Sequence, residues 1–165
     1  MRKNETVAGE RRQVNSKSKG IRKATEQDIP AIVRLENQCF QTPWSEKSIR
    51  EDMTKNDLSV YIVCEADDEI VGYAGIWFIA GEGHINNVCV SPSHRCKGFG
   101  QELVLGLIGI AEEHGVFDMT LEVRKSNDPA IKLYEKNGFN EAGIRPGYYQ
   151  DNGEDAVIMW RENEG

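Results

Sequence analysis

The segment VSPSHRCKGFGQELVLGLIGIAEEHG, residues 90–115, decides the fold. A basic run with two glycines, residues 94–100, leads directly into an apolar stretch whose spacing is typical of an amphipathic helix. Unpaired N–H groups at a helix start, together with the helix dipole, favour an anion. Arg95 and Lys97 add positive charge, and the glycines let the backbone approach a ligand. The segment therefore predicts a pyrophosphate site between a strand and a helix.

The predicted helix has a buried stripe and a glycine stop at Gly115. The stripe consists of Leu103, Val104, Leu107, Ile108 and Ala111. The loop before it matches neither the spacing of a nucleotide-triphosphate P-loop nor that of a dinucleotide-binding loop. A Gly-x-Gly helix entry alone is more often a simple turn, so the anion site needs support from the rest of the chain.

Outward from this segment, periodicity and turn signals predict alternating helices and strands. The expected order is a strand at 21–24, a helix from a start signal at 25–28 to Cys39, a helix capped by Ser45, strands at 60–66, 70–80 and 84–90, the helix above, a strand at 120–123, a short helix from 128, and two strands around 151–153. The turns between the first three long strands are placed at 67–69 and 81–83. This order indicates one α/β (α+β) domain around a mixed sheet.

Composition and charge limit the number of domains and the kinds of partner. The chain has 165 residues, of which 39% are hydrophobic and 28% charged, typical of one globular domain. Residues 1–20 carry a net charge of +4 and are interpreted as a basic, disordered tail; residues 21–165, with a net charge of −11, form the domain. Such an acidic body disfavours nucleic acid and favours basic partners. No apolar run suggests a membrane span or a secretion signal, which predicts a cytoplasmic protein.

The four cysteines are scattered at positions 39, 64, 89 and 96. They form no C-x-x-C pair and have no histidine at metal-ligand spacing, so the sequence predicts no metal site and no disulfide scaffold. Free thiols suit a reducing compartment.

Several motifs together resemble the GNAT superfamily of N-acetyltransferases, and within it the RimI-type enzymes. Residues 90–100 look like the acetyl-CoA pyrophosphate loop of that family. The other motifs that carry the resemblance are Pro43–Glu46, Leu121–Arg124 with Ser126-Asn127, Leu133–Phe139, Gly147–Tyr149 and Glu154–Ala156. The resemblance covers about residues 20–161. It implies a single GNAT-type domain with a mixed, mostly antiparallel sheet of about seven strands and flanking helices.

The resemblance also implies an activity. RimI-type enzymes transfer acetyl from acetyl-CoA to the N-terminal alanine of a small-subunit ribosomal protein, by direct attack in a ternary complex. The chemistry fits, because a protein α-amine has a reference pKa near 7.7–8.0 against about 10.4 for lysine. An appreciable fraction of the α-amine is therefore neutral at pH 7 and needs little help from a base. Acylation of another amine, and a non-catalytic acetyl-CoA-binding module, remain as alternatives.

Roles for single residues follow from the resemblance. Glu122, near the end of the predicted fifth strand, corresponds to a general base, and Tyr134 to the acid that protonates the coenzyme A thiolate. The positions that correspond to acetyl-CoA contacts are Val88, Cys89, Val90, Arg95, Cys96, Lys97, Gly98, Phe99, Gly100, Gln101 and Asn127. The candidates for the substrate groove are Trp44, Tyr148 and Tyr149.

Each role has a plainer alternative. Glu122 could be solvated or paired with Arg124 at a strand end, and Asn127 could be a turn or cap residue. Tyr134 would pack its ring in the core in either case. The adjacent acids at 154 and 155 are interpreted as a solvated strand end rather than as a site for a cationic N-terminus.

Two positions depart from the family pattern. Cys96 stands in the loop where a larger polar or basic residue is commoner, which favours slightly weaker cofactor affinity. Asn86 occupies a position that is usually apolar or small, which puts the details of the substrate groove in doubt.

Overall fold

The computed structural model describes residues 20–162, so the predicted basic tail lies outside the described residues except for Gly20. The order of strands and helices predicted from the sequence is confirmed, with two short 3-10 turns added at Glu26–Asp28 and Pro92–His94. The elements are β1 (Gly20–Lys23), α1 (Ile29–Cys39), α2 (Glu46–Lys55), β2 (Ser59–Ala66), β3 (Glu69–Ile79), β4 (Glu82–Val90), α3 (Phe99–Glu113), β5 (Asp118–Arg124), α4 (Asp128–Lys136), β6 (Asn140–Tyr149) and β7 (Glu154–Arg161).

The strands form one seven-stranded sheet in the order β1-β2-β3-β4-β5-β7-β6. Every neighbouring pair is antiparallel except β4 and β5. The expected mixed, mostly antiparallel sheet is therefore confirmed. The crossover that joins the parallel pair is α3, which is the helix that opens at the glycine-containing loop.

Two-residue turns join β2 to β3 and β3 to β4. Asp67 and Asp68 have φ angles of 53° and 66°, and Ala80 and Gly81 have 52° and 80°. Two successive positive φ angles match the twist of a tight antiparallel hairpin. The bounds of the turn predicted at 81–83 are wrong, because the turn consists of Ala80 and Gly81 and β4 already begins at Glu82.

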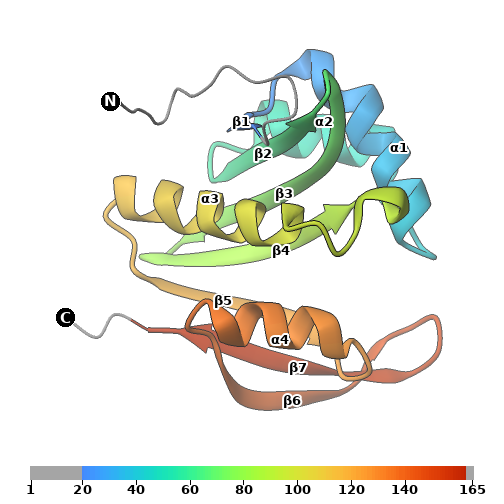
Figure 1. The fold of residues 1–165 in the computed structure, drawn as a ribbon. Coiled ribbons are helices and arrows are strands. Elements are labelled where there is room, and N and C mark those ends of the chain that lie inside the picture. Colours follow the sequence, from blue (N-terminus) through green and yellow to red (C-terminus); the bar gives the residue numbers. More distant parts are fainter. Residues whose placement is uncertain (1–19, 163–165) are drawn as a thin grey trace.

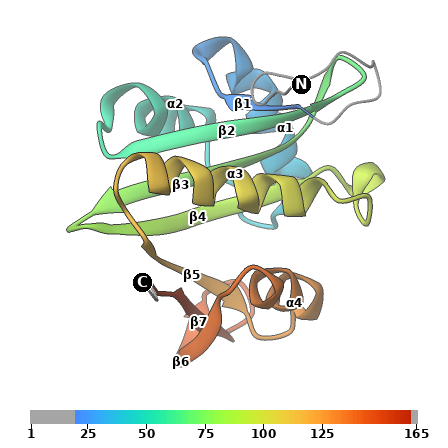
Figure 2. The same ribbon diagram turned by 60° about the vertical axis from the view of Figure 1, so that its left-hand side comes forward.

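Helices cover the sheet on both faces (Figures 1 and 2). On one face, α1 and α2 bury Ile29, Ile32, Leu35 and Ile49 against Tyr61, Val63, Tyr73 and Cys89. On the other face, the predicted stripe of α3 is buried in a larger cluster that also includes Tyr134 of α4 and Phe139. The opposite face of β5, β6 and β7 has no helix of its own among the described residues.

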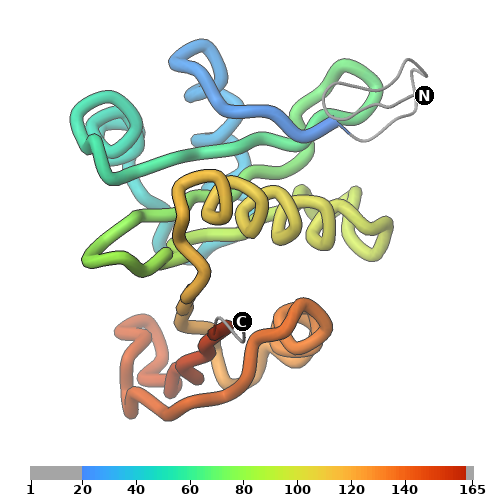
Figure 3. The backbone as a smooth tube through the Cα atoms, turned by 90° about the vertical axis from the view of Figure 1, so that its left-hand side faces the viewer, coloured from blue at the N-terminus to red at the C-terminus, as the bar shows by residue number. Residues whose placement is uncertain are grey.

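The only parallel pair in the described sheet is short. Residues Glu82–His84 of β4 pair with Asp118–Thr120 of β5, and from Ile85 onward β4 has no partner on its β5 side. The chain from β5 onward consequently forms a second lobe that diverges from the first (Figure 3). Strand β4 also contains a β-bulge on its β3 side. Gly75 and Ile76 of β3 face Asn87 and Ile85, which leaves Asn86 as an extra residue in β4.

The predicted fifth strand is longer than expected. It extends to Arg124 and pairs with β7 along that length. Glu122 is near the end of this strand, as expected, with Val123 and Arg124 after it. Glu122 lies inside β5, opposite Ile158, because pairing with β7 continues past the point where the apolar pattern stops.

Candidate active site

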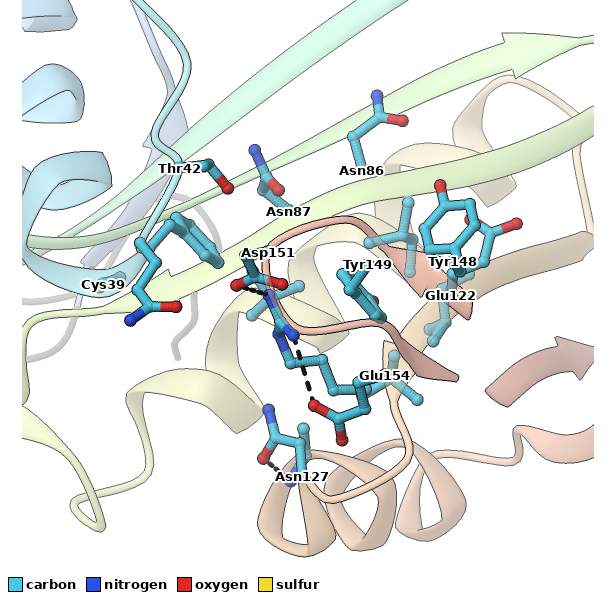
Figure 4. A pocket seen from close by; sticks show the side chains of 18 of the residues that line it. Cys39, Thr42, Asn86, Asn87, Glu122, Asn127, Tyr148, Tyr149, Asp151 and Glu154 are labelled. Atoms are coloured by element: carbon cyan, nitrogen blue, oxygen red, sulfur yellow. Dashed lines mark hydrogen bonds and ion pairs between the residues drawn. The ribbon is translucent and has the colours of Figure 1, made fainter. Parts of the chain in front are cut away.

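A cavity of about 610 Å³ lies where β4 and β5 diverge (Figure 4). Its walls come from the end of α1 and the α1–α2 loop, from β4, β5 and α4, and from the β6–β7 turn. The charged residues in its lining are Glu36, Glu122, Arg124, Asp151 and Glu154. Four acids against one base give the cavity a negative character, which suits a cationic ligand.

The structure brings many of the predicted site residues to this cavity. Those that line it are Trp44, Val88, Glu122, Asn127, Tyr134, Tyr148 and Tyr149. The other predicted cofactor positions, Cys89, Val90 and Arg95 to Gln101, are not in its lining and belong to the end of β4 and the loop that enters α3.

Glu122 projects from the helix-free face of β5. Its neighbours Leu121 and Val123 point into the core shared by α3 and α4, and successive strand residues point to opposite faces. Arg145 Nε donates to Glu122 Oε2 at 3.2 Å. No described residue donates to Oε1, so the carboxylate keeps one oxygen open toward the cavity.

Of the two plain alternatives for Glu122, pairing with Arg124 is not what the structure shows, whereas the side chain is partly exposed to solvent. Arg124 does not pair with Glu122; its guanidinium donates to Asp151 at 2.8 Å and to Glu154 at 3.3 Å. Arg124 also lies 4.0 Å from the ring centre of Tyr149. Arg124 lies on the same face of β5 as Glu122, but its guanidinium holds the β6–β7 turn over the cavity and does not pair with Glu122.

The acidic pair near this turn is not a solvated strand end, so that interpretation is wrong. The main-chain N–H of Ser126 donates to Glu154 at 2.7 Å, and that of Gly147 donates to Asp155 at 2.9 Å. The hydrogen bonds from Ser126 and Arg124 hold the pKa of Glu154 below its ordinary value. Both acids fix the backbone around the cavity.

Tyr134 lies at the base of the cavity on α4. Its ring is buried against Phe139 in an edge-to-face contact with 5.7 Å between ring centres. Burial, followed by the nearby Tyr149, raises the pKa of Tyr134 above the ordinary value of a phenol. No hydrogen bond to another described residue ties its hydroxyl, so packing aims a protonated O–H at the cavity.

The loop before α3 has the geometry of an anion site. Gly98 is the N-cap residue of α3 with φ of 90°, and Cys96 has φ of 62°. The N–H of Glu102 already bonds the carbonyl of Gly98, so the N–H groups of Gly100 and Gln101 have no acceptor within the helix. A side chain at Gly100 would come within 3.2 Å of Leu133, so the glycine also lets α3 and α4 approach each other.

Arg95 and Gln101 have structural bonds of their own. Arg95 Nε donates to the carbonyl of Val90 at 3.1 Å, which ties the loop back to the end of β4. The Gln101 amide exchanges hydrogen bonds of 3.0 and 2.9 Å with the amide of Asn137 after α4. A diphosphate at this loop would therefore meet main-chain N–H groups first, with positive charge held beside them.

Asn127 acts as a cap, as its plain alternative states. Its Oδ1 accepts from the N–H of Ala130 at 3.3 Å, at the start of α4. Capping uses only the oxygen, so the Nδ2 donor stays available to the cavity that Asn127 lines.

Sequence reasoning missed a buried carboxylate in the cavity wall. Glu36 is 1% exposed and accepts from Tyr73 Oη, from Asn87 Nδ2 at 3.1 Å and from the N–H of Trp44 at 2.8 Å. The sequence does indicate that residue 36 is buried, because it continues the buried stripe of Ile29 and Ile32 at helical spacing. An acid in such a stripe predicts donors around it.

Two cysteines meet beside the loop. The Cys39 thiol donates to the carbonyl of Val90 at 3.4 Å, and Arg95 Nη2 lies 3.6 Å from its sulfur. The neighbouring Cys89 thiol is the largest influence that lowers the pKa of Cys39, and Arg95 adds to it, in spite of partial burial. Cys39 lines the cavity, whereas Cys89 is buried.

Within residues 20–162, no helix is long and apolar enough to cross a membrane. In the same part of the chain, no three side chains of the metal-ligating types gather closely enough to hold an ion.

Comparison with known proteins supplies the context for this site. Residues 29–139 match the family model described as Acetyltransferase (GNAT) family. The ribosomal protein bS18-alanine N-acetyltransferase of Escherichia coli is 37% identical over 134 residues, which cover 80% of this chain and 89% of the relative. The Salmonella typhimurium protein of the same name is 38% identical over the same shares.

Solved structures agree. The crystal structure of the ribosomal-protein-S18-alanine N-acetyltransferase from Escherichia coli matches with a TM-score of 0.81 and 33% identity, covering 90% of this chain and 97% of that one. Ard1 from Thermoplasma volcanium matches with a TM-score of 0.77 and 25% identity, over 87% of this chain and 96% of that one.

The pKa of Cys39 gives a testable pH dependence. The thiolate is the reactive form, so alkylation of Cys39 by iodoacetamide is expected to rise with pH around a midpoint below the pKa of an ordinary thiol. Cys89→Ala removes the strongest influence that lowers this pKa and is expected to move the midpoint upward. Peptide-level mass spectrometry of quenched samples measures Cys39 separately from the exposed Cys96. An unchanged midpoint in the variant would contradict the assigned cause.

Proposed function

The chain belongs to the acetyltransferase (GNAT) family, and from this premise we propose that it acetylates the N-terminal alanine of a small-subunit ribosomal protein with acetyl-CoA. The names of the similar bacterial proteins support this substrate. The observation that carries the proposal is the placement of Glu122 and Tyr134 in one cavity between diverging strands, each with an oxygen free of any described partner. Acetylation of a ribosomal protein would take place in the cytoplasm.

The main chain supports acetyl-CoA on the side of α3 and α4. Main-chain groups along β4 from Val88 to Val90 that lack a β5 partner would bind the pantetheine arm, except the Val90 carbonyl, which accepts from Arg95 and Cys39. The N–H groups that open α3 would hold the diphosphate. Gly98 and Gly100 keep that approach free of side chains, while Lys97 and Arg95 add charge to it. Asn127 Nδ2 would contribute a further donor.

The acid and base would divide the proton transfers between them. A bond forms between the substrate nitrogen and the acetyl carbon, and the carbon–sulfur bond breaks. Glu122 takes the proton that the amine loses, directly or through a water molecule, and Tyr134 gives its proton to the departing sulfur. The raised pKa of Tyr134 keeps its hydroxyl protonated until the thiolate forms. No covalent enzyme intermediate is needed.

The acidic lining favours the N-terminus of a basic protein. Trp44 and Tyr148 are 36% and 46% exposed, and Tyr149 stacks edge-to-face on Tyr148. Trp44 stands on the α1–α2 loop and the two tyrosines stand at the end of β6; all three line the cavity, where they would hold the first residues of a peptide. The same lining would accept another amine, which makes lysine side chains and polyamines the alternative substrates to test.

The proposed substrate class can be tested directly. Release of coenzyme A thiol is expected with peptides that start with alanine and copy the N-terminus of ribosomal protein S18. The same peptides with a blocked N-terminus are the matched control and are expected to give none. Mass spectrometry should find one acetyl group on the α-amine. Turnover with polyamines or internal lysines alone would overturn the proposed substrate, and acetyl-CoA binding without any turnover would favour the non-catalytic module.

Replacement of the base should slow the reaction. Glu122→Gln keeps the shape of the side chain and removes the proton acceptor, so kcat is expected to fall by about 10²–10⁴ near pH 7. The loss should shrink at higher pH, where more of the substrate amine is already neutral. Steady-state rates from pH 6 to 9.5 measure this, with Glu141→Gln on the exposed β6 as control. A parallel pH–rate profile for the wild type and Glu122→Gln would remove Glu122 as the base.

Replacement of the acid should leave binding intact. Tyr134→Phe retains the ring that packs on Phe139 and deletes only the hydroxyl. The rate of acetyl transfer is expected to fall by roughly 10²–10⁴, while calorimetry should give the wild-type affinity for acetyl-CoA. Wild-type turnover by this variant would assign the thiolate proton to another donor.

A further inference from the structure

Asn87 is an amide in the cavity wall whose orientation is set by its neighbours. Its Nδ2 donates to Glu36 Oε1 at 3.1 Å and lies 3.0 Å from Tyr73 Oη. A carboxylate offers only acceptors, so the amide must turn its nitrogen toward Glu36. The side-chain oxygen of Asn87 therefore has to face the other way.

That oxygen has no donor among residues 20–162. The hydrogen bonds of Asn87 to described residues use Nδ2 only. Its Oδ1 has no partner among them but is not buried, so it is accessible to solvent. Since Asn87 lines the cavity, its Oδ1 is open to that space. Figure 4 shows this oxygen on the side of Tyr149 and Asp151, with the nitrogen turned away from them.

Asn87 and Glu122 stand on the same side of the sheet. Asn87 bonds to Glu36 of α1, and the α1 side is opposite to the core that takes Leu121 and Val123 of β5. The alternation along β5 puts Glu122 on that α1 side too. The two residues come from the two strands that diverge, so both face the cavity from the side opposite α3 and α4.

We propose that Asn87 Oδ1 accepts a hydrogen bond from the terminal amine of the substrate and orients it for attack. The inference rests on the proposed function, because it assigns a residue that holds the nucleophile of that reaction. The buried Glu36 carboxylate behind the amide polarises it and makes its oxygen a better acceptor for a cationic donor. Glu36 is then a positioning residue that acts through Asn87.

Loss of the hydrogen bond from the amine to Asn87 should weaken the reaction of the peptide and leave the binding of acetyl-CoA unchanged. Loss of a hydrogen bond to a charged donor costs about 1.5–3 kcal/mol, which corresponds to roughly 10- to 150-fold. Asn87→Ala is therefore expected to lower kcat/KM for an alanine-starting peptide at least tenfold and to leave the KM for acetyl-CoA within about twofold of wild type. A merely structural role would change both, because the two ligands share the β4 wall.

Matched variants separate the contact from damage to the fold. Asn37→Ala is the control, since the Asn37 side chain bonds only the carbonyl of Val33 in its own helix, and wild-type kinetics are expected. Asn87→Ser keeps a polar side chain at this position but lacks the carbonyl, so it should show the loss even if Asn87→Ala folds poorly. The Gln side chain in Glu36→Gln offers both a donor and an acceptor, so the amide of Asn87 is free to turn, and a several-fold loss of peptide kcat/KM is expected. The double variant Glu36→Gln/Asn87→Ala should have the same kcat/KM as Asn87→Ala alone.

The outcomes distinguish this inference from the proposed function. Wild-type enzyme that does not acetylate the peptide contradicts the proposed function itself. Wild-type turnover combined with unchanged peptide kcat/KM in Asn87→Ala and Asn87→Ser overturns the role of Asn87 alone. A peptide N-methylated at its second residue, which lacks that amide N–H, should show the same loss with Asn87→Ala; disappearance of the loss would mean that Asn87 accepts from the peptide bond and not from the amine.

Discussion

The short parallel pairing of β4 and β5 is the constraint on which the site depends. Three residues on each strand pair, and the strands then diverge while β5 continues to pair with β7 on its other edge as far as Arg124. Divergence leaves main-chain groups of β4 without strand partners, which is costly in a sheet interior unless a ligand or water binds them. The same divergence opens the space that the cavity occupies. A fully paired sheet with the same helices would have neither the unpaired main-chain groups of β4 nor the cavity.

The two faces of the sheet present different groups to a ligand. The α3 and α4 side carries the helix start and its glycines, which suit a diphosphate. The α1 side carries Glu122 and Asn87, together with the acidic lining. Two ligands can thus enter from opposite faces and meet only in the gap between the strands. This arrangement favours direct transfer, because neither ligand has to leave before the other binds.

The parts of the structure that could be predicted from the sequence are those encoded locally. The buried stripe of α3, the serine cap of α2 and the hairpin turns follow from the spacing and turn chemistry of adjacent residues. The family motifs also placed Glu122 and Tyr134 together. Contacts between residues far apart in the chain could not be predicted: Glu36 meets Asn87 across 51 positions, and Arg124 meets Asp151 across 27. The bulge at Asn86 depends on the register with β3, which the pattern of β4 alone does not contain.

The buried carboxylate of Glu36 connects these observations. A buried charge with its partners adds little to stability compared with apolar side chains of similar volume, so stability alone is a weak reason for an acid at this position. Its bonds instead reach both walls on the α1 side, because Oε2 accepts from the N–H of Trp44 and Oε1 accepts from Asn87. One side chain thereby fixes the α1–α2 loop and the amide of β4 relative to each other. Rigid positioning of polar groups in a cavity is what selective binding of an amine requires, and here the requirement is met by a residue that the amine itself would not touch.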